Sequence, residues 1–344
     1  MICSYEIRVK GADHKGTDTP CQDACRIIKY KDEDLVIAAV ADGVGSENRS
    51  DFGARIAVDA STYYCRQHIS TLKTAYEIPQ MIKKAFMVAQ DEIAKEAKVQ
   101  SHNVAQYHTT LSLAILHSDT LYYGHSGDSG IIALTTEGRF EKVTEQQRDE
   151  GGGVFTLYFE QKRVFGRFEK KVCSVLLATD GMLDLFIPKI LENEPVKINT
   201  YAAGFFVRDW KSRIEKQGEN TVISCIEHYV RNGAKEVSGD DLTVLGLMNT
   251  SVESTSQPDD YYKELDWAEL KRKHMEENST DESENNSESV LALPNDKPHG
   301  VSIDGEATAK PTEKSGIDTK NNIPDETEVE SPKKKGLLEK LFGG

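Results

Sequence analysis

Long hydrophobic runs are missing from this chain of 344 residues. No stretch approaches the roughly 20 apolar residues that span a bilayer. The first residues, MICSYEIRVKG, lack the basic start and apolar core of a secretory leader. The six cysteines include no C-x-x-C pair, which indicates reduced, structural thiols. We therefore expect a cytoplasmic protein without stable membrane association.

An excess of positive charge is missing as well. The net charge is −15, and residues 251–344 alone hold 22 acidic and 12 basic residues, which leaves −5 for residues 1–250. No basic face is evident before residue 250. Because neutralising phosphates requires clustered lysine and arginine, the composition argues against nucleic acid as a general partner.

The acidic part of the chain is also poor in aromatic residues and punctuated by proline, as in STDESENNSES and NNIPDETEVESPKKK. Such a composition does not bury enough apolar surface to offset the entropy of ordering. We predict a folded domain over residues 1–250 and a largely disordered acidic tail over residues 251–344.

Two short segments of this tail are less polar. YYKELDWAELKRKHM (261–275) and the final KKKGLLEKLFGG set apolar residues at helical spacing. They are either incidental hydrophobes in a solvated tail or short motifs that dock into the groove of a partner protein.

Within residues 1–250, apolar runs predict strands that are grouped rather than alternating with helices. Strands are expected over residues 2–9, 25–30, 35–41, 110–117, 120–124, 130–135, 172–178 and 241–248. Helices are expected over residues 50–69, with Phe52, Ile56, Ala60 and Tyr63 on one face, and 78–98, with Ile78, Ile82, Phe86 and Ile93 on one face. The grouping favours an α+β fold of two packed antiparallel sheets flanked by helices.

Aspartates stand where several of these strands end. The apolar run VIAAVA stops at Asp42-Gly43, and VLLA is followed by Asp180-Gly181. Asp240 and Asp241 enter the last strand, and GHSGDSG places Asp128 in a predicted hairpin. Each alone is consistent with an ordinary turn aspartate.

Several carboxylates at one sheet edge repel each other unless a cation holds them. No histidine or cysteine stands beside these aspartates at ligand spacing. Oxygen ligands alone favour Mg²⁺ or Mn²⁺ over Zn²⁺. The pattern therefore predicts a shared metal cluster that activates water for attack at phosphorus.

These segments, in this order, resemble the metal-dependent protein serine/threonine phosphatases of type 2C, over about residues 10–248. VADGVGS is similar to the family's V-A-D-G-x-G, GHSGDSG to V-G-D-S-R, LLATDGMLD to L-x-x-S-D-G-L-x-D, and GDDLTVLGL to D-N-x-T-V. TPCQDACRI occupies the place of the N-E-D-x segment. The resemblance implies a four-layer sandwich that hydrolyses phosphoserine and phosphothreonine with two or three Mn²⁺ or Mg²⁺ ions.

The resemblance also implies roles for individual residues. Asp42 would bridge two metals, the carbonyl of Gly43 would bind one of them, and Asp180 and Asp240 would complete the site. Asp23 would act directly or through water.

A third and weaker metal would lie at Asp128, with Asp184 as its companion. The usual phosphate-clamping arginine near the N-terminus is not evident; either His14 or Lys15 takes its place, or both are solvated loop residues.

The chain also departs from the family pattern. Gln22 stands in place of glutamate, Gly130 in place of the arginine after D-S, and Asp241 in place of asparagine. No histidine follows Asp42-Gly43, so a protein general acid is absent there. The order G-x-x-H, P-C-Q-D and D-G-x-G-S resembles a bacterial branch of the family.

The substrate implied by the resemblance is a phosphorylated protein, paired with a cognate serine/threonine kinase, and we expect a monomer. Two alternatives stay open. The first is a catalytically silent scaffold or phosphoprotein-binding module, although every direct metal-ligand position is an aspartate. The second is a metal-dependent nuclease or small-molecule phosphatase, which also uses clustered carboxylates.

Overall fold

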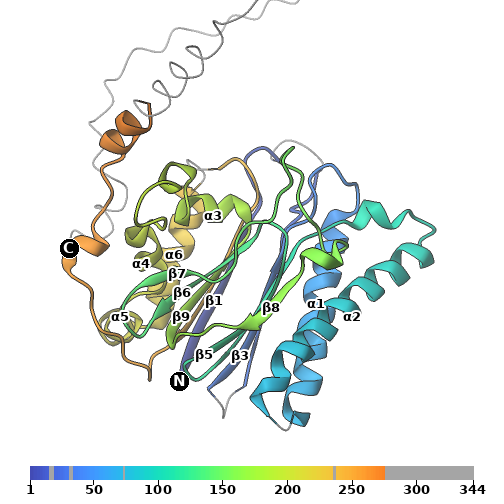
Figure 1. Ribbon diagram of the computed structural model, residues 1–344, viewed down its shortest axis with the longest axis horizontal. Coiled ribbons are helices and arrows are strands. Elements are labelled where there is room, and N and C mark those ends of the chain that lie inside the picture. Colours follow the sequence, from blue (N-terminus) through green and yellow to red (C-terminus); the bar gives the residue numbers. More distant parts are fainter. Residues whose placement is uncertain (15–18, 31–33, 73, 235–237, 276–344) are drawn as a thin grey trace, which may run out of the picture. The chain divides into compact units, whose positions relative to one another are not determined.

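Two antiparallel sheets lie face to face in this computed structural model (Figure 1). The structure describes residues 1–14, 19–30, 34–72, 74–234 and 238–275, and the statements below concern these residues. One sheet has the order β1-β10-β9-β6-β7, with β1 Ile2–Val9, β10 Leu242–Asn249, β9 Val172–Ala178, β6 Gly130–Thr135 and β7 Phe140–Lys142. The other has the order β2-β3-β4-β5-β8, with β2 Ala24–Lys29, β3 Leu35–Ala41, β4 Leu111–His117, β5 Thr120–Ser126 and β8 Val164–Arg167.

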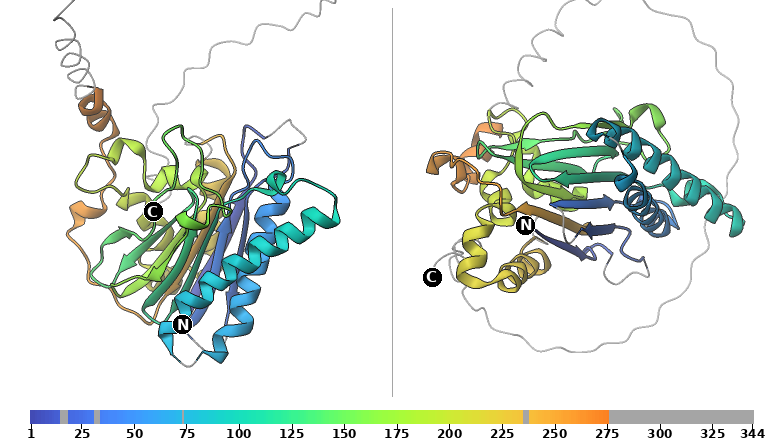
Figure 2. Two further views of the ribbon diagram at one scale, coloured as in Figure 1. Left: turned by 45° about the vertical axis from the view of Figure 1, so that its right-hand side comes forward. Right: turned by 90° about the horizontal axis from the view of Figure 1, so that it is seen from below.

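Helices cover the outer face of each sheet, which makes four layers (Figures 1 and 2). Two long helices, α1 Ser50–His68 and α2 Ile78–Val99, pack on the β2-β3-β4-β5-β8 sheet. The opposite sheet is covered by α3 Asp180–Phe186, α4 Thr200–Val207, α5 Trp210–Gln217 and α6 Glu219–Asn232. Short 3₁₀ helices lie at Ile69–Thr71, Ala75–Glu77, Val104–Tyr107, Glu160–Lys162, Lys189–Leu191 and Asp259–Tyr262. No helix among the described residues is long and apolar enough to cross a membrane.

Strand β3 shows how the sequence forms the layers. Every residue of β3 is buried. Ile37 and Ala39 join the core under α1 and α2, whereas Val36, Ala38 and Val40 join the core between the two sheets. Since side chains alternate along a strand, only a continuous apolar run fills both cores. The predicted architecture of two antiparallel sheets flanked by helices is confirmed.

The predicted hairpin around Asp128 is wrong. Strand β5 pairs with β4 and β8, whereas β6 pairs with β9 and β7 in the other sheet. The three residues from Gly127 to Ser129 therefore carry the chain from one sheet to the other. Two consecutive apolar runs separated by a short glycine turn look alike in both cases, so local pattern did not distinguish a crossing from a hairpin.

The predicted face of α1 is only partly correct, whereas that of α2 is correct. Phe52, Ile56 and Ala60 pack against the core but are only partly buried. Tyr63 is 56% exposed, and the buried side of α1 consists of small residues, among them Gly53, Ala54, Ala57 and Ser61. Small residues allow close packing: a Cβ on Gly53 would lie 2.0 Å from the carbonyl oxygen of Tyr107. Helix α2 buries Ile78, Ile82, Phe86 and Ile93, as predicted.

The chain continues against the domain beyond β10. The Thr255 amide donates to the Thr136 carbonyl at 2.7 Å, and the Tyr262 hydroxyl donates to the Gly138 carbonyl at 2.6 Å. The boundary at residue 250 and the disorder of the tail stay predictions, but these contacts tie part of the predicted tail to the domain. The apolar residues of the final segment lie outside the described residues.

Candidate metal centre

Asp42 stands at the end of β3, where its backbone is fixed from both sides. Its amide donates to the Thr110 hydroxyl at 2.9 Å, and its carbonyl accepts from the Thr110 amide and the Thr109 hydroxyl, each at 2.8 Å. The next residue must be small, because a Cβ on Gly43 would lie 2.6 Å from the backbone of Ser50 at the start of α1. The Asp-Gly pair thus places the carboxylate at the sheet edge while the chain turns into the helix.

Asp180 and Asp23 come from the two different sheets, and the residue before Asp180 bonds to Asp23. Asp180 begins α3 directly after β9, and Asp23 directly precedes β2. The hydroxyl of the intervening Thr179 donates to Asp23 Oδ2 at 2.8 Å. Thr179 stands at the helix N-cap, yet its side chain makes no capping bond. It therefore positions Asp23 rather than the helix.

Asp128 lies where the chain crosses between the sheets. Gly127 has a φ of +112°, a conformation that glycine adopts without a steric penalty. Asp128 itself is 1% exposed, and its Oδ2 atom lies 2.5 Å from Nη2 of Arg148. Its Oδ1 atom is buried and has no hydrogen-bond partner.

Asp240 and Asp241 precede β10 and have different roles. Asp241 is buried and accepts the amides of Gly11 and Gln22, each at 2.7 Å, so it anchors the N-terminal loop. Asp240 is exposed and lines the same pocket as Asp42. His14 lies 3.2 Å from Asp241 Oδ1.

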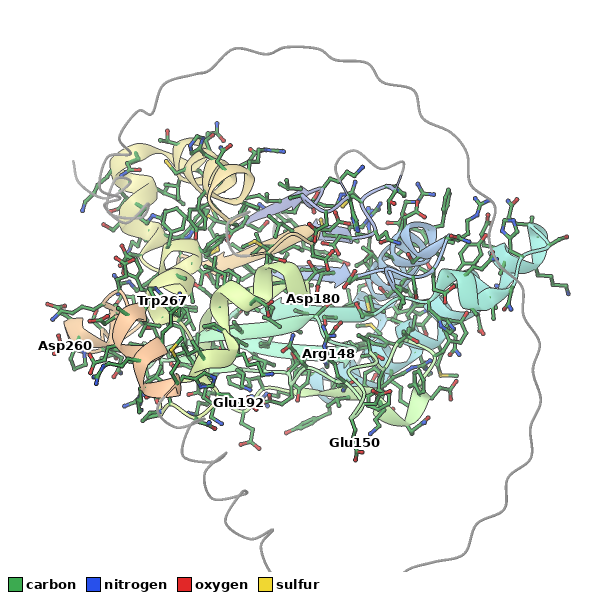
Figure 3. The ribbon with its side chains drawn as sticks, turned by 90° about the horizontal axis from the view of Figure 1, so that it is seen from above. Arg148, Glu150, Asp180, Glu192, Asp260 and Trp267 are labelled. Carbon is green, nitrogen blue, oxygen red and sulfur yellow. The ribbon has the colours of Figure 1, made fainter. Side chains whose placement is uncertain are left out.

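The carboxylates converge at one end of the sandwich. Single oxygens of Asp42, Asp128 and Asp180 all lie within 4.8 Å of one another. They line a pocket of about 140 Å³ together with Asp240 and Gly43. Figure 3 shows Asp180 and Arg148 close to each other in the view from above.

Burial and mutual repulsion make this cluster costly without a cation. Burial, followed by repulsion from Asp23, raises the pKa of Asp42 well above its ordinary value. Burial raises the pKa of Asp23 to about 8, and burial together with Asp180 raises that of Asp128 to about 6. The pKa of Asp180 is raised by burial as well. Each shift disfavours the charged form, and a bound cation would reverse it.

The donor set fits a hard divalent cation. All the converging ligands are carboxylate oxygens, which Mg²⁺ and Mn²⁺ prefer. The buried and unpartnered Oδ1 of Asp128 is the kind of atom that an ion or its water satisfies. The residues present therefore fit the metal centre that the sequence predicts.

The other predicted residues lie around this pocket or outside it. Asp23 is buried behind the cluster and does not line the pocket. Asp184 is exposed on α3 and lines a neighbouring pocket. His14 contacts Asp241 rather than the pocket that Asp42 lines. Lys15 lies outside the described residues.

Sequence reasoning missed Arg148. It lies in the segment between β7 and β8, in the stretch QQRDEGGG. Its Nη2 atom contacts both Asp128 and Asp180, at 2.5 and 3.0 Å. Three consecutive glycines mark a loop but do not indicate where that loop folds, so no local signal pointed to this contact.

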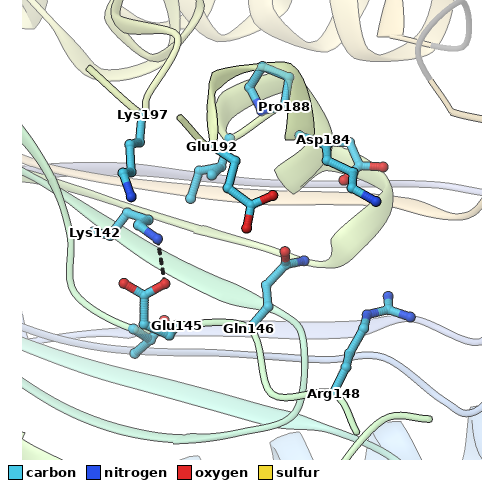
Figure 4. A pocket seen from close by; sticks show the side chains of 11 residues that line it. Lys142, Glu145, Gln146, Arg148, Asp184, Pro188, Glu192 and Lys197 are labelled. Carbon is cyan, nitrogen blue, oxygen red and sulfur yellow. Dashed lines mark hydrogen bonds and ion pairs between the residues drawn. The ribbon is translucent and has the colours of Figure 1, made fainter. Parts of the chain in front are cut away.

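Arg148 also borders a larger pocket of about 620 Å³ (Figure 4). Its walls carry charges of both signs, among them Lys142, which is paired with Glu145, and Glu192. Asp184 lies on the opposite side of this pocket. The aspartate pocket and the larger pocket thus share one side chain, that of Arg148.

Comparison with known proteins agrees with these observations. The chain matches the family model described as protein phosphatase 2C over residues 10–223. No curated protein matches the chain.

Similar solved structures include a bacterial serine phosphatase, with 14% identity, a TM-score of 0.49, and coverage of 75% of this chain and 100% of that one. Another is the serine/threonine phosphatase Stp1 from Staphylococcus aureus, with 14% identity, a TM-score of 0.48, and coverage of 72% and 95%. A third is the catalytic domain of PstP in complex with two manganese ions, with 15% identity, a TM-score of 0.47, and coverage of 72% and 97%.

Proposed function

The chain belongs to the protein phosphatase 2C family and is a metal-dependent protein serine/threonine phosphatase, and we propose that its reaction takes place in the aspartate pocket at the end of the sandwich. The observation that carries this assignment is the convergence of the carboxylates of Asp42, Asp128 and Asp180 within 4.8 Å. They reach this point from a strand end, a crossing between sheets and a helix start.

The strand-end residues are proposed to hold two ions. Asp42 would hold both ions, the Gly43 carbonyl would hold one of them, and Asp180 and Asp240 would complete the ligand set, with Asp23 acting directly or through water. A third and weaker ion is proposed at Asp128, with Asp184 near it. Whether Mn²⁺ or Mg²⁺ serves in the cell is decided by availability as much as by these oxygen ligands.

Such ions, when bound, supply a water of lowered pKa as the nucleophile and neutralise charge on the phosphoryl oxygens. The chain itself holds the aspartates in position. Thr109 and Thr110 fix the backbone of Asp42, and Thr179 orients Asp23. No histidine lines the pocket among the described residues, so a histidine general acid has no place there.

The substrate is proposed to be a phosphorylated protein, with a serine/threonine kinase as the opposing enzyme and a monomer as the active form. A silent scaffold is disfavoured because each proposed direct ligand side chain is an aspartate. A nuclease is disfavoured by the acidic charge of the chain, since a nucleic-acid track requires clustered lysine and arginine.

The test is hydrolysis of a panel of substrates by the full chain with Mn²⁺. Phosphoserine and phosphothreonine peptides should be cleaved, whereas nucleotides and nucleic acid should not. Excess EDTA should abolish turnover, and in ¹⁸O-labelled water the label should appear in the released phosphate without a covalent phosphoenzyme. A trapped phosphoenzyme, or full activity in EDTA, would overturn the mechanism.

Variants locate the chemistry. Asp42→Asn should lower kcat by about 10³-fold or more, because a bridging charge is lost. Asp59→Asn is the matched control, since Asp59 is ion-paired with Arg26 outside the pocket and should keep normal activity. Near-native activity of Asp42→Asn would refute the bridging role.

A further inference from the structure

One guanidinium nitrogen lies between two carboxylates of the aspartate pocket. Nη2 of Arg148 is 2.5 Å from Asp128 Oδ2 and 3.0 Å from Asp180 Oδ2. These two aspartates also contribute to the group of oxygens that lie within 4.8 Å of one another. The nitrogen therefore occupies the space between oxygens that the proposed function assigns to metal ions.

Charge balance explains why the arginine lies there. Among the described residues that line the pocket, four are aspartates and Arg148 is the sole cation. The Asp128 side chain is 2% exposed, and a buried carboxylate without a counterion is strongly unfavourable. Arg148 supplies that counterion from within the chain.

The Arg148 side chain can also move away from the two aspartates. This side chain is long, and 43% of it is exposed. The loop after Arg148 is held mainly by hydrogen bonds within the loop. The Asp149 carboxylate accepts hydrogen bonds from the amides of Gly151 and Gly153 at 2.9 and 2.7 Å. Among the described residues, the other hydrogen bond of the guanidinium runs from Nη1 to the Gly152 carbonyl of this loop, at 3.4 Å, so its withdrawal breaks no hydrogen bond to a strand.

A metal ion bound at Asp128 and Asp180 would compete with this guanidinium for the same carboxylate oxygens. Mg²⁺ binds carboxylate oxygens at about 2.0–2.1 Å, and Nη2 already contacts oxygens of the same two carboxylates, at 2.5 Å from Asp128 and 3.0 Å from Asp180. Two cations that share the same pair of oxygens repel each other strongly in a partly buried pocket.

We propose that Arg148 is a tethered cation that competes with metal ions for the carboxylates of Asp128 and Asp180. The inference rests on the proposed function in that these aspartates hold metal. Without metal, Arg148 stabilises the acidic pocket. Metal binding displaces the guanidinium toward the larger pocket that it also borders, so occupancy of the metal site is coupled to the shape of the neighbouring surface.

Calorimetric titration of the metal-stripped full chain with Mn²⁺ tests this inference. Arg148→Gln should bind Mn²⁺ about tenfold more tightly at the site that involves Asp128 and Asp180, since an intramolecular competitor is gone. The metal-free variant should unfold at a lower temperature than the metal-free wild type, and Mn²⁺ should raise its unfolding temperature by more. Arg148→Lys keeps a charge on a shorter donor and should fall between the two.

Arg26→Gln is the matched control. Arg26 is 49% exposed and lies 2.7 Å from Asp59, so its loss removes the same charge and a similar ion pair outside the pocket. It should bind Mn²⁺ as the wild type does. Equal or weaker Mn²⁺ binding by Arg148→Gln would overturn the competition.

The Asp180→Asn variant distinguishes failure of the proposed competition from failure of the proposed metal site. If the wild type binds Mn²⁺, Asp180→Asn loses binding and Arg148→Gln changes nothing, the inference fails while the metal site stands. If neither the wild type nor Arg148→Gln binds Mn²⁺, the proposed metal site fails and the competition falls with it.

Discussion

The hydroxyl of Thr179 donates a hydrogen bond of 2.8 Å to Oδ2 of Asp23. Thr179 follows β9 in one sheet and Asp23 precedes β2 in the other, and both residues are buried. This bond thus fastens the two sheets together at the end that carries the aspartate pocket. It also lowers the pKa of Asp23, against the larger effect of burial, which raises it.

Thr179→Val should weaken this end of the sandwich. Valine keeps the shape of threonine but removes this hydrogen-bond donor to the buried Asp23 carboxylate, which should lower the free energy of unfolding by about 1–3 kcal/mol. Mn²⁺ binding should weaken as well, because Asp23 loses orientation. Urea unfolding and calorimetry measure the two effects.

Thr179→Ser is the control for this prediction, since serine retains the hydroxyl. It should restore most of the stability and the Mn²⁺ affinity. Equal stability of the valine and serine variants would show that the hydrogen bond contributes nothing.

Eight of the ten strands among the described residues, and the aspartates at strand ends, were predictable because both are local; the short strands β7 and β8 were not predicted. A run such as Val36–Ala41, followed by Asp-Gly, specifies a buried strand and its end within a few residues. The contacts of Arg148 and the Thr179–Asp23 bond join positions far apart in the chain. Such contacts depend on the sheet topology, which local pattern does not determine.

The prediction for α1 missed its most deeply buried residues for a related physical reason. Large apolar residues normally mark the core face, but α1 packs so closely that only small side chains fit, and its larger apolar residues lie at the margins. A prediction from hydrophobic periodicity has no information on how near the neighbouring backbone comes.

Two helical glycines provide a test of that close packing. Gly53→Ala should destabilise the protein by about 1–3 kcal/mol, because the added Cβ would lie 2.0 Å from the Tyr107 carbonyl oxygen. Gly204 in α4 is the matched control: its nearest neighbour would be the side chain of Arg208 at 3.8 Å. Gly204→Ala should therefore stabilise by about 0.4–1 kcal/mol. Chemical denaturation of both variants decides, and equal effects would contradict the packing argument.

His125 should make stability depend on pH. Its Nε2 donates to the Glu145 carbonyl at 2.9 Å, and in the neutral ring its Nδ1 accepts from the Ser112 hydroxyl at 2.8 Å. Burial lowers the pKa of His125 to about 4, below the value of about 6.5 in an unfolded chain. Because the folded pKa is depressed, its contribution is fully present above pH 6.5 and is lost as the pH falls toward 4.

The contribution of His125 is measured as a difference between proteins. Between pH 7 and 4 the wild type should lose up to about 3 kcal/mol that His125→Gln does not lose. Buried carboxylates act in the opposite direction and are common to both proteins. Parallel curves of unfolding free energy against pH would contradict the assignment.

The segment after β10 should be part of the stable domain. The Tyr261 hydroxyl accepts from the Phe140 amide at 2.8 Å, the Tyr262 hydroxyl donates to the Gly138 carbonyl at 2.6 Å, and the Arg208 guanidinium lies 3.9 Å from the centre of the Tyr262 ring. A chain ending at residue 250 loses all of these contacts. It should unfold about 6–12 °C below the full chain, since about 3 kcal/mol of hydrogen bonding and cation–π contact is removed.

A chain ending at Met275 keeps these contacts and is the matched control. It should unfold at the temperature of the full chain and hydrolyse phosphopeptides at the same rate, because the aspartate pocket and its supports are untouched. Thermal unfolding of the two truncations, with Tyr262→Phe to isolate one hydrogen bond, measures the effect. If the chain ending at residue 250 is as stable as the chain ending at Met275, the contacts of Tyr261 and Tyr262 are incidental and the domain ends with β10.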